Sequence, residues 1–256
     1  MYANYHTHTY RCGHAIGTEE DYIKNAIAGG IKIMGFSDHV PFLFPDGHQM
    51  GWKVQVEDSE DYISTINSLK EKYRDQIKIY VGFEMEYYPE HFENMLKFVK
   101  GLGAQYLILG QHFIKNEEED RPHSVAAGHG EDDLVEYTDN VIEGMKTGKF
   151  LYVAHPDMLN YDGDIEVYQR EAKRLCMVAK KLDIPLEINL LGVHDSRHYP
   201  NEVFWQIAGN IGCKVIFGFD SHTAERAYDA ESIEKAKVLV EKYNLKLVDE
   251  LDIKGI

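Results

Sequence analysis

The stretch Asn4-Tyr5-His6-Thr7-His8 begins the chain with the pattern of a short β-strand that ends in histidines. Side chains of a strand alternate between its two faces, so His6 and His8 point the same way. A third imidazole, His14, follows on the next loop. Neutral imidazoles that converge at a strand end are good ligands for a divalent transition metal. An H-x-H pair alone is weak evidence, so the rest of the chain has to support this interpretation.

Working outward from this stretch, apolar, β-branched runs alternate with helical patterns to the end of the chain. The predicted strands are Ala3–Thr9, Lys32–Ser37, Ile77–Glu84, Tyr106–Gln111, Leu151–Ala154, Pro185–Asn189 and Lys214–Phe219. The predicted helices start at a Thr18 cap and at Ser59, and lie near Pro89–Lys100, Asp132–Thr147, Ile165–Leu182, Asn201–Gly212 and Ala224–Tyr243. Strict alternation predicts parallel strands with helices outside, because parallel strands need crossover connections.

Five of the later predicted strands end in a histidine or a carboxylate. These motifs are Ser37-Asp38-His39, Gly82-Phe83-Glu84, Gly110-Gln111-His112, Ala154-His155-Pro156 and Asp220-Ser221-His222. Each alone more often caps or solvates a strand end, but their repetition is what a multinuclear metal site requires. Only a ring-like sheet brings so many strand ends to one centre. We therefore predict an α/β fold, a closed or nearly closed seven-stranded TIM-like barrel, as one domain over residues 1–256.

The bulk composition narrows the class of protein. Apolar residues make up 44% of the chain, the formal net charge is −16, and no basic run is evident. This balance argues against a nucleic-acid partner, although metals can still attract a phosphate substrate. The longest apolar runs are strand-length, which argues against a membrane partner, and no signal peptide is evident. Three scattered cysteines, Cys12, Cys176 and Cys213, argue against a disulfide framework and favour the cytoplasm.

Taken in order, the H-x-H, S-D-H, G-F-E, Q-H, A-H-P and D-S-H motifs resemble the polymerase-and-histidinol-phosphatase (PHP) superfamily. The resemblance spans Tyr5 to His222 and is strongest to the monofunctional histidinol-phosphate phosphatases. It implies a distorted (β/α)₇ barrel with a trinuclear metal centre at the carboxyl ends of its strands. The ligands that it implies are His6, His8, Glu84 and Asp220 for one ion, Glu84, His112 and His155 for a second, and His14, His39 and His222 for a third. Mixed nitrogen and oxygen ligation favours zinc, iron or manganese.

The resemblance implies hydrolysis of a phosphomonoester by a hydroxide that bridges the metals. Our hypothesis is that Asp220 or His222 orients the water or handles the leaving-group proton, with a bound water as the rival donor. Cys12 lies in the same loop as His14, but the ligand set is full without it.

Substrate contacts are less well marked. Arg197 matches the family's basic position before a Y-P pair and is predicted to clamp the phosphate, with Arg11 as a weaker second candidate. The family's second basic residue after H-P-D is missing, because Met158-Leu159-Asn160 stands there. Glu117 or Glu118 with Phe113 could receive the ammonium and imidazole of histidinol phosphate, although a solvated acidic loop is an equal reading.

The first-choice function is therefore a cytoplasmic metallophosphatase acting on L-histidinol phosphate in histidine biosynthesis. Another small phosphomonoester, a nuclease-like phosphodiesterase activity and a non-catalytic metal-binding module remain as alternatives. Two long connections, 40–58 and 113–131, interrupt the regular alternation, and the first has the aromatic residues of a lid over the strand ends. The other histidines are interpreted as ordinary surface or lid residues: His48, His91, His123, His129, His194 and His198.

Overall fold

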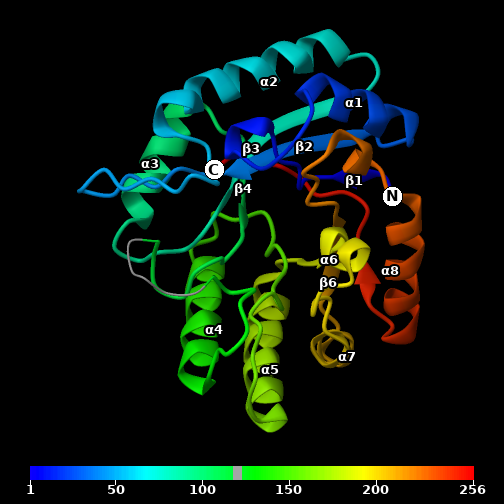
Figure 1. Cartoon of the computed structure of the whole chain (residues 1–256). Helices are drawn as coiled ribbons and strands as arrows, with labels where there is room; N and C mark the ends of the chain where they lie inside the picture. The colour runs from blue at the N-terminus through cyan, green and yellow to red at the C-terminus, as the bar shows by residue number, and fades with distance from the viewer. Residues whose placement is uncertain (118–122) are drawn as a thin grey trace.

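The computed structural model describes residues 1–117 and 123–256, and one or more helices separate each strand from the next along the chain (Figure 1). A parallel sheet in the order β1-β2-β3-β4 forms the first part. A second parallel sheet has the order β5-β6-β7. The strands are β1 Ala3–Asn4, β2 Ile33–His39, β3 Lys78–Met85, β4 Tyr106–Leu109, β5 Leu186–Asn189, β6 Lys214–Gly218 and β7 Lys246–Leu247.

Isolated bridges join the two sheets into a distorted barrel. Val153 pairs with Leu109 on one side and with Leu186 on the other, so it takes the place of a strand between β4 and β5. At the opposite seam Thr7 pairs with Ser221, and the His8 amide donates to the Ser221 carbonyl at 3.0 Å. The predicted TIM-like α/β architecture is thus confirmed. The predicted strands Ala3–Thr9 and Leu151–Ala154 are too long, because most of their residues lack a continuous ladder partner.

The helices cover the outside of the sheets, and their starts follow the sequence signals. Thr18 closes a capping box with Asp21 at the start of α1, and Asn201 accepts hydrogen bonds from two amides at the start of α7. The predicted helix Ala224–Tyr243 is divided, because Tyr228 and Asp229 are extended and Asp229 caps a new helix. The α-helices are α1 Glu19–Ala28, α2 Ser59–Tyr73, α3 Phe92–Leu102, α4 Glu131–Lys146, α5 Ile165–Leu182, α6 Leu190–Asp195, α7 Glu202–Ile211 and α8 Ala230–Lys242. The short 3₁₀ helices are η1 Tyr10–Cys12, η2 Val56–Asp58 and η3 Ala224–Ala227.

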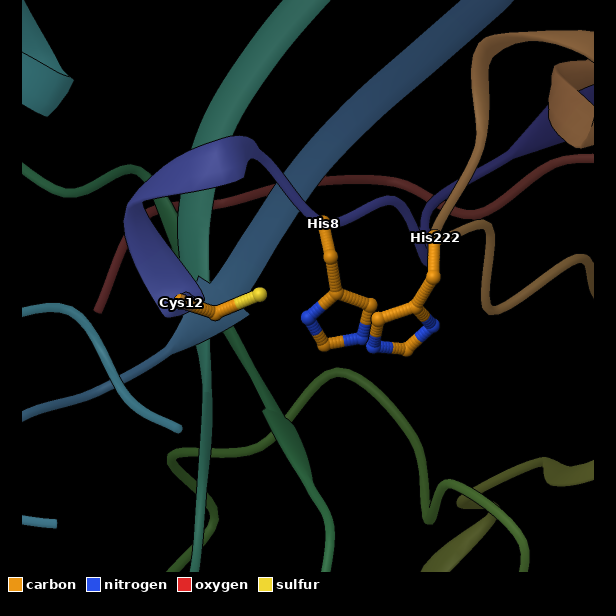
Figure 2. Close-up of side chains that lie close together, drawn as sticks. All are labelled: His8, Cys12 and His222. Atoms are coloured by element: carbon orange, nitrogen blue, oxygen red, sulfur yellow. The ribbon is translucent and has the colours of Figure 1, made fainter. Parts of the chain in front are cut away.

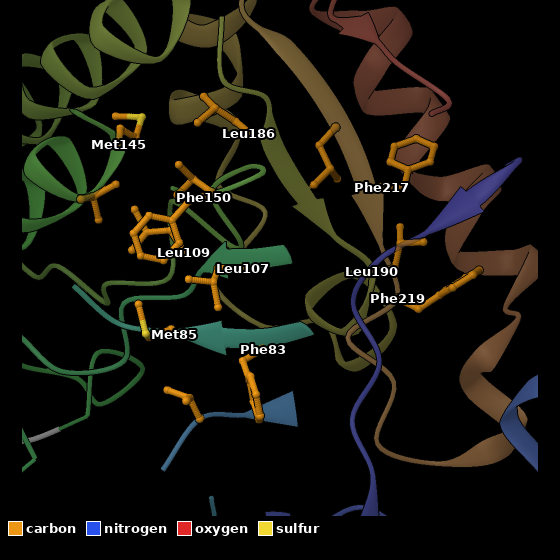
Figure 3. Close-up of a cluster of buried hydrophobic side chains, with 14 of the residues drawn as sticks. Phe83, Met85, Leu107, Leu109, Met145, Phe150, Leu186, Leu190, Phe217 and Phe219 are labelled. Atoms are coloured by element: carbon orange, nitrogen blue, oxygen red, sulfur yellow. The ribbon is translucent and has the colours of Figure 1, made fainter. Parts of the chain in front are cut away.

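The main hydrophobic core lies between the sheets and the helices outside them. Figure 3 shows part of it, where Phe83 and Leu107 of the first sheet and Leu186 and Phe217 of the second lie in one cluster with Met145 of α4. Burying such side chains contributes roughly 1.5–3 kcal/mol each. This shared core holds the strand ends at fixed positions. None of the helices in the described residues has both the length and the apolar character needed to cross a membrane.

The connection 40–58 is packed down rather than free. The ring of Phe42 lies 4.6 Å from that of Tyr88, and the ring of Trp52 lies 5.0 Å from His39 and 5.6 Å from His112. Lys53, 1% exposed, donates to both carboxylate oxygens of Glu86 at 2.8 and 2.7 Å and also pairs with Glu117. The aromatic connection therefore does lie beside the strand ends, where a buried ion pair anchors it.

Candidate metal centre

Glu84 is the central carboxylate of a histidine cluster at the carboxyl end of β3. Its Oε1 lies 2.7 Å from His155 Nε2 and 3.4 Å from His112 Nε2. Its Oε2 faces the other half of the cluster, 3.3 Å from His6 Nε2 and 3.1 Å from His39 Nδ1. The carboxylate is 1% exposed. Each of its oxygens can therefore serve a different cation.

Asp220 is the second carboxylate and completes the group around the first strand. Its Oδ1 lies 3.0 Å from His8 Nε2 and 3.5 Å from His6 Nε2, and its Oδ2 accepts from Asn189 Nδ2 at 3.0 Å. Asp220 and His155 both have positive φ, 50° and 29°. Such backbone strain costs about 1–3 kcal/mol per residue and gathers at functional sites. With these backbone conformations Asp220 faces His6 and His155 faces Glu84.

His14, His39 and His222 form a third group, with ligand atoms within 4.8 Å of one another. His14 is exposed, whereas His39 is buried, so this group lies at the mouth of the cluster. Figure 2 shows the Cys12 side chain directed towards the ring of His8, which stacks on His222 at 4.1 Å. Burial raises the pKa of the Cys12 thiol, so a proton is retained on a sulfur that a metal would need as thiolate.

Outer hydrogen bonds fix the rings of three of these histidines. The Nδ1 atoms face Glu187 Oε1 at 2.8 Å for His6, Asp38 Oδ1 at 3.3 Å for His8 and Glu86 Oε1 at 2.8 Å for His112. A metal-binding histidine usually gives its other ring nitrogen to such a partner, which orients it and raises its basicity. In all three cases Nε2 is left to face the carboxylates of the cluster.

Two strand-end glycines make room for the carboxylates. A Cβ atom on Gly110 would collide with the Glu84 carboxylate, and one on Gly218 would collide with that of Glu187. The Gly-x-His and Gly-Phe-Asp parts of the motifs are thus steric requirements of the site. We expect Gly110→Ala to displace Glu84 and weaken any metal bound there.

The protonation pattern suits cation binding. Burial lowers the pKa of His112 and His222 to about 3, which keeps these imidazoles neutral. Burial would also lower the pKa of His6, but Glu187, Asp220 and Glu84 outweigh it and raise the pKa well above the ordinary value. A proton on His6 thus balances the negative charge of the buried Glu84 and Asp220 carboxylates, as a bound divalent ion would.

Several buried atoms of the cluster have no hydrogen-bond partner among the described residues. These atoms are His6 Nε2, His8 Nε2, His39 Nδ1, His155 Nδ1, His222 Nε2 and Glu84 Oε2. Leaving a buried polar group without a partner costs about 1–3 kcal/mol. So many in one place fit a metal ligand set, and the structure brings all nine predicted ligands into this cluster.

A cavity of about 440 Å³ opens above the cluster, and Arg197 lies on its wall. The guanidinium donates to Tyr199 Oη at 2.8 Å and to Asp195 Oδ2 at 3.0 Å. Asp220 and His222, the two predicted proton-handling residues, also line the cavity. Arg197 is therefore placed where a phosphate could reach both it and the cluster.

The other predicted substrate contacts lie elsewhere. Arg11 does not line the cavity, because its guanidinium pairs with Glu19 and Asp61 beside η1. Glu117 is 6% exposed and is paired with Lys53, while Phe113 packs beneath Trp52 at a centroid distance of 6.0 Å. In the structure buried pairing or packing holds each of these three side chains, and none of them lines the cavity. Glu118 lies outside the described residues.

His123 and Arg226 are among the cavity-lining residues that sequence reasoning missed. His123, interpreted above as a surface or lid residue, lines the cavity with its ring 5.4 Å from that of His112, and burial lowers its pKa to about 3. Arg226 also lines the cavity, and its Nη1 donates to Asp195 Oδ1 at 3.1 Å. Neither belongs to a motif, so only the tertiary structure could have found them. His129 is also buried rather than a surface residue.

A curled parallel barrel with a histidine-and-carboxylate cluster at its strand ends defines the class, that of metal-binding TIM-like barrel proteins. The chain belongs to the PHP domain family, whose model matches residues 4–190.

Named relatives agree with this placement. The chain is similar to a probable histidinol-phosphatase of Deinococcus radiodurans, 25% identical over 222 residues that cover 85% of each chain. It is 31% identical over 119 residues to the histidinol-phosphatase of Bacillus subtilis, with 44% of each covered. Its fold is similar to the crystal structure of histidinol phosphate phosphatase from Lactococcus lactis complexed with zinc, L-histidinol and phosphate, with a TM-score of 0.76, 20% identity and 98% of each chain covered.

Proposed function

We propose that the chain hydrolyses L-histidinol phosphate to L-histidinol and phosphate. It is a metal-dependent phosphatase, the activity for which its PHP relatives are named. The observation that carries the proposal is the Glu84 carboxylate, which presents one oxygen to each half of a histidine cluster beneath an arginine-lined cavity. The complex of the Lactococcus lactis relative with zinc, L-histidinol and phosphate supports this choice of substrate.

The ligand assignment is part of the proposal. His6, His8 and Asp220 would hold one ion, His112 and His155 a second, with Glu84 shared, and His14, His39 and His222 a third. Divalent ions, when bound, polarise a phosphate ester and lower the pKa of a bound water. This chain's contribution is to hold nine donor groups at the ends of its strands and in the loops that follow them.

The cavity residues then act on the substrate. Arg197 binds phosphate oxygens, for which its planar fork is suited. Asp220 lies between His8 and Asn189 and lines the cavity, where its carboxylate would orient the attacking water, or accept a proton from that water and pass it to the leaving alkoxide. His222 also lines the cavity, but its lowered pKa keeps the imidazole neutral, which favours the rival donor, a bound water.

Phosphate release from three substrates tests the proposal. We expect kcat/KM for L-histidinol phosphate to exceed that for p-nitrophenyl phosphate by more than about tenfold, and a single-stranded oligonucleotide to remain intact. A smaller ratio would contradict the biosynthetic assignment and leave another small phosphomonoester. Cleavage of the oligonucleotide would favour the phosphodiesterase alternative, and no hydrolysis at all would favour a non-catalytic metal-binding module.

Replacing Arg197 by Ala should weaken substrate binding without loss of metal. A charge-assisted hydrogen bond contributes about 1.5–3 kcal/mol, so we expect KM to rise by about tenfold to a hundredfold. Steady-state kinetics and elemental analysis measure the two effects. Arg74→Ala, on an exposed arginine of the α2 end, is the matched control and should leave both unchanged. Loss of metal in Arg197→Ala would contradict the assigned role.

A further inference from the structure

Arg226 is held beside the cluster by the same segment that supplies Asp220 and His222. It lies in η3, where its amide donates to the Thr223 carbonyl at 3.0 Å. Ser221 Oγ, between the two ligands, donates to the Arg226 carbonyl at 2.8 Å. The backbone of Arg226 is therefore tied directly to the last metal-ligand motif, which fixes where its side chain begins.

Asp195 joins Arg226 to Arg197. Its Oδ1 accepts from Arg226 Nη1 at 3.1 Å, and its Oδ2 accepts from Arg197 Nη2 at 3.0 Å. One carboxylate thus spaces two guanidiniums on the same wall, and the three groups together carry one net positive charge. A guanidinium has five N–H donors, so most of those on Arg226 remain for another acceptor.

The cavity chemistry says which acceptor fits. Among the described residues that line the cavity, Arg197 and Arg226 are the only arginines, none is a lysine, and Asp195 and Asp220 are the only carboxylates. Asp220 faces His8 and His6, and Asp195 faces the two arginines. A small dianion between this wall and a metal cluster would meet cations on both sides. If Arg226 served only in its ion pair with Asp195, that partly exposed pair would contribute only about 0–1 kcal/mol to stability.

We propose that Arg226 is a second phosphate-binding residue, braced by Asp195 against Arg197, so that two guanidiniums grip the phosphate of the substrate. This inference rests on the proposed function for the identity of the substrate. The class of ligand, a phosphate dianion, is inferred independently of the proposed function. Arg226 is thus a binding residue that sets affinity for the phosphate end of the ligand.

Calorimetric binding of inorganic phosphate to the metal-loaded protein is the test, made with Arg226→Gln, Arg226→Lys and the exposed control Arg74→Gln. We expect Kd for phosphate to rise about tenfold in Arg226→Gln and less in Arg226→Lys, whose charge remains but whose fork is lost. Metal content and Tm should stay at wild-type values. With L-histidinol phosphate, KM should rise by a similar factor while kcat changes less than about threefold.

The outcomes separate this inference from the proposed function. A phosphate Kd within about twofold of wild type in Arg226→Gln would overturn it and leave Arg226 as a structural partner of Asp195. If Arg226→Gln fails to fold, Arg226→Lys decides, since unchanged phosphate affinity and KM there contradict the need for a fork. If wild type binds phosphate but does not hydrolyse L-histidinol phosphate, the proposed function fails, while the calorimetric comparison still tests Arg226.

Discussion

Glu84→Gln is expected to reduce phosphate release by about a thousandfold or more and to lower the metal content of the purified protein. Removing one group that stabilises charge in a transition state already costs about 10²–10³ in kcat, and Glu84 is proposed to serve two ions at once. The geometry behind this expectation is the division of its oxygens, Oε1 towards His155 and Oε2 towards His6. An amide at this position offers one oxygen and a poor NH₂ partner, so one half of the cluster loses its anionic ligand.

The control for Glu84→Gln is Glu93→Gln, because Glu93 is an exposed carboxylate in the first turn of α3. It should match wild type in metal content and rate. The readouts are elemental analysis and steady-state phosphate release at saturating substrate. Full metal content with near-normal kcat in Glu84→Gln would show that Glu84 is not a shared ligand.

Lys53→Met is expected to destabilise the fold by about 3–5 kcal/mol, the cost of removing one partner from a buried ion pair. The ammonium is buried with Glu86 and Glu117, and Glu86 in turn accepts from His112 Nδ1 at 2.8 Å. Without Lys53 two carboxylates share a buried space with no cation. Chemical denaturation at pH 7.5 measures the loss, and Lys97→Met, on an exposed lysine of α3, should change stability by less than about 0.5 kcal/mol.

The deficit of Lys53→Met should grow with pH. Burial raises the pKa of Glu117 to about 7 in the native protein, and loss of the cation can only raise it further. A carboxyl with a raised native pKa binds more protons when folded than when unfolded, so its protonated form supports the fold at low pH. That support is lost as pH rises from the ordinary glutamate value through the native pKa. A deficit that shrank between pH 5 and pH 8 would contradict the ion-pair explanation.

The ligand motifs could be predicted because they depend on local pattern alone. The H-x-H spacing predicted that His6 and His8 face the same way, although β1 ends at Asn4, and parallel strands bring their carboxyl ends to one edge, so no side-chain packing has to be known. Arg226 and His123 could not be predicted, since η3 and the 113–131 connection reach the cavity only through tertiary contacts. Nothing in their spacing distinguishes them from surface residues.

The substrate contacts were the weakest part of the sequence prediction for a related reason. Arg11 and Glu117 carry the right charges and lie close in sequence to metal ligands, but Glu19, Asp61 and Lys53 had to be placed before their pairing could be seen. The β7 strand was missed because Lys246–Leu247 is short and pairs only with Lys214 and Val215 at the start of β6. The metal ligands could therefore be predicted from the sequence better than the ion-pair partners of the charged side chains.

Counting ions is the most direct measurement of the central claim. Metal-free protein titrated with zinc or manganese, followed by calorimetry and elemental analysis, should bind three ions per chain, and phosphatase activity should return with them. Crystals of the loaded protein should show anomalous density between Glu84 and the rings of His6 and His155. A chain that binds no transition ion, or that releases phosphate at full rate when metal-free, would contradict the account.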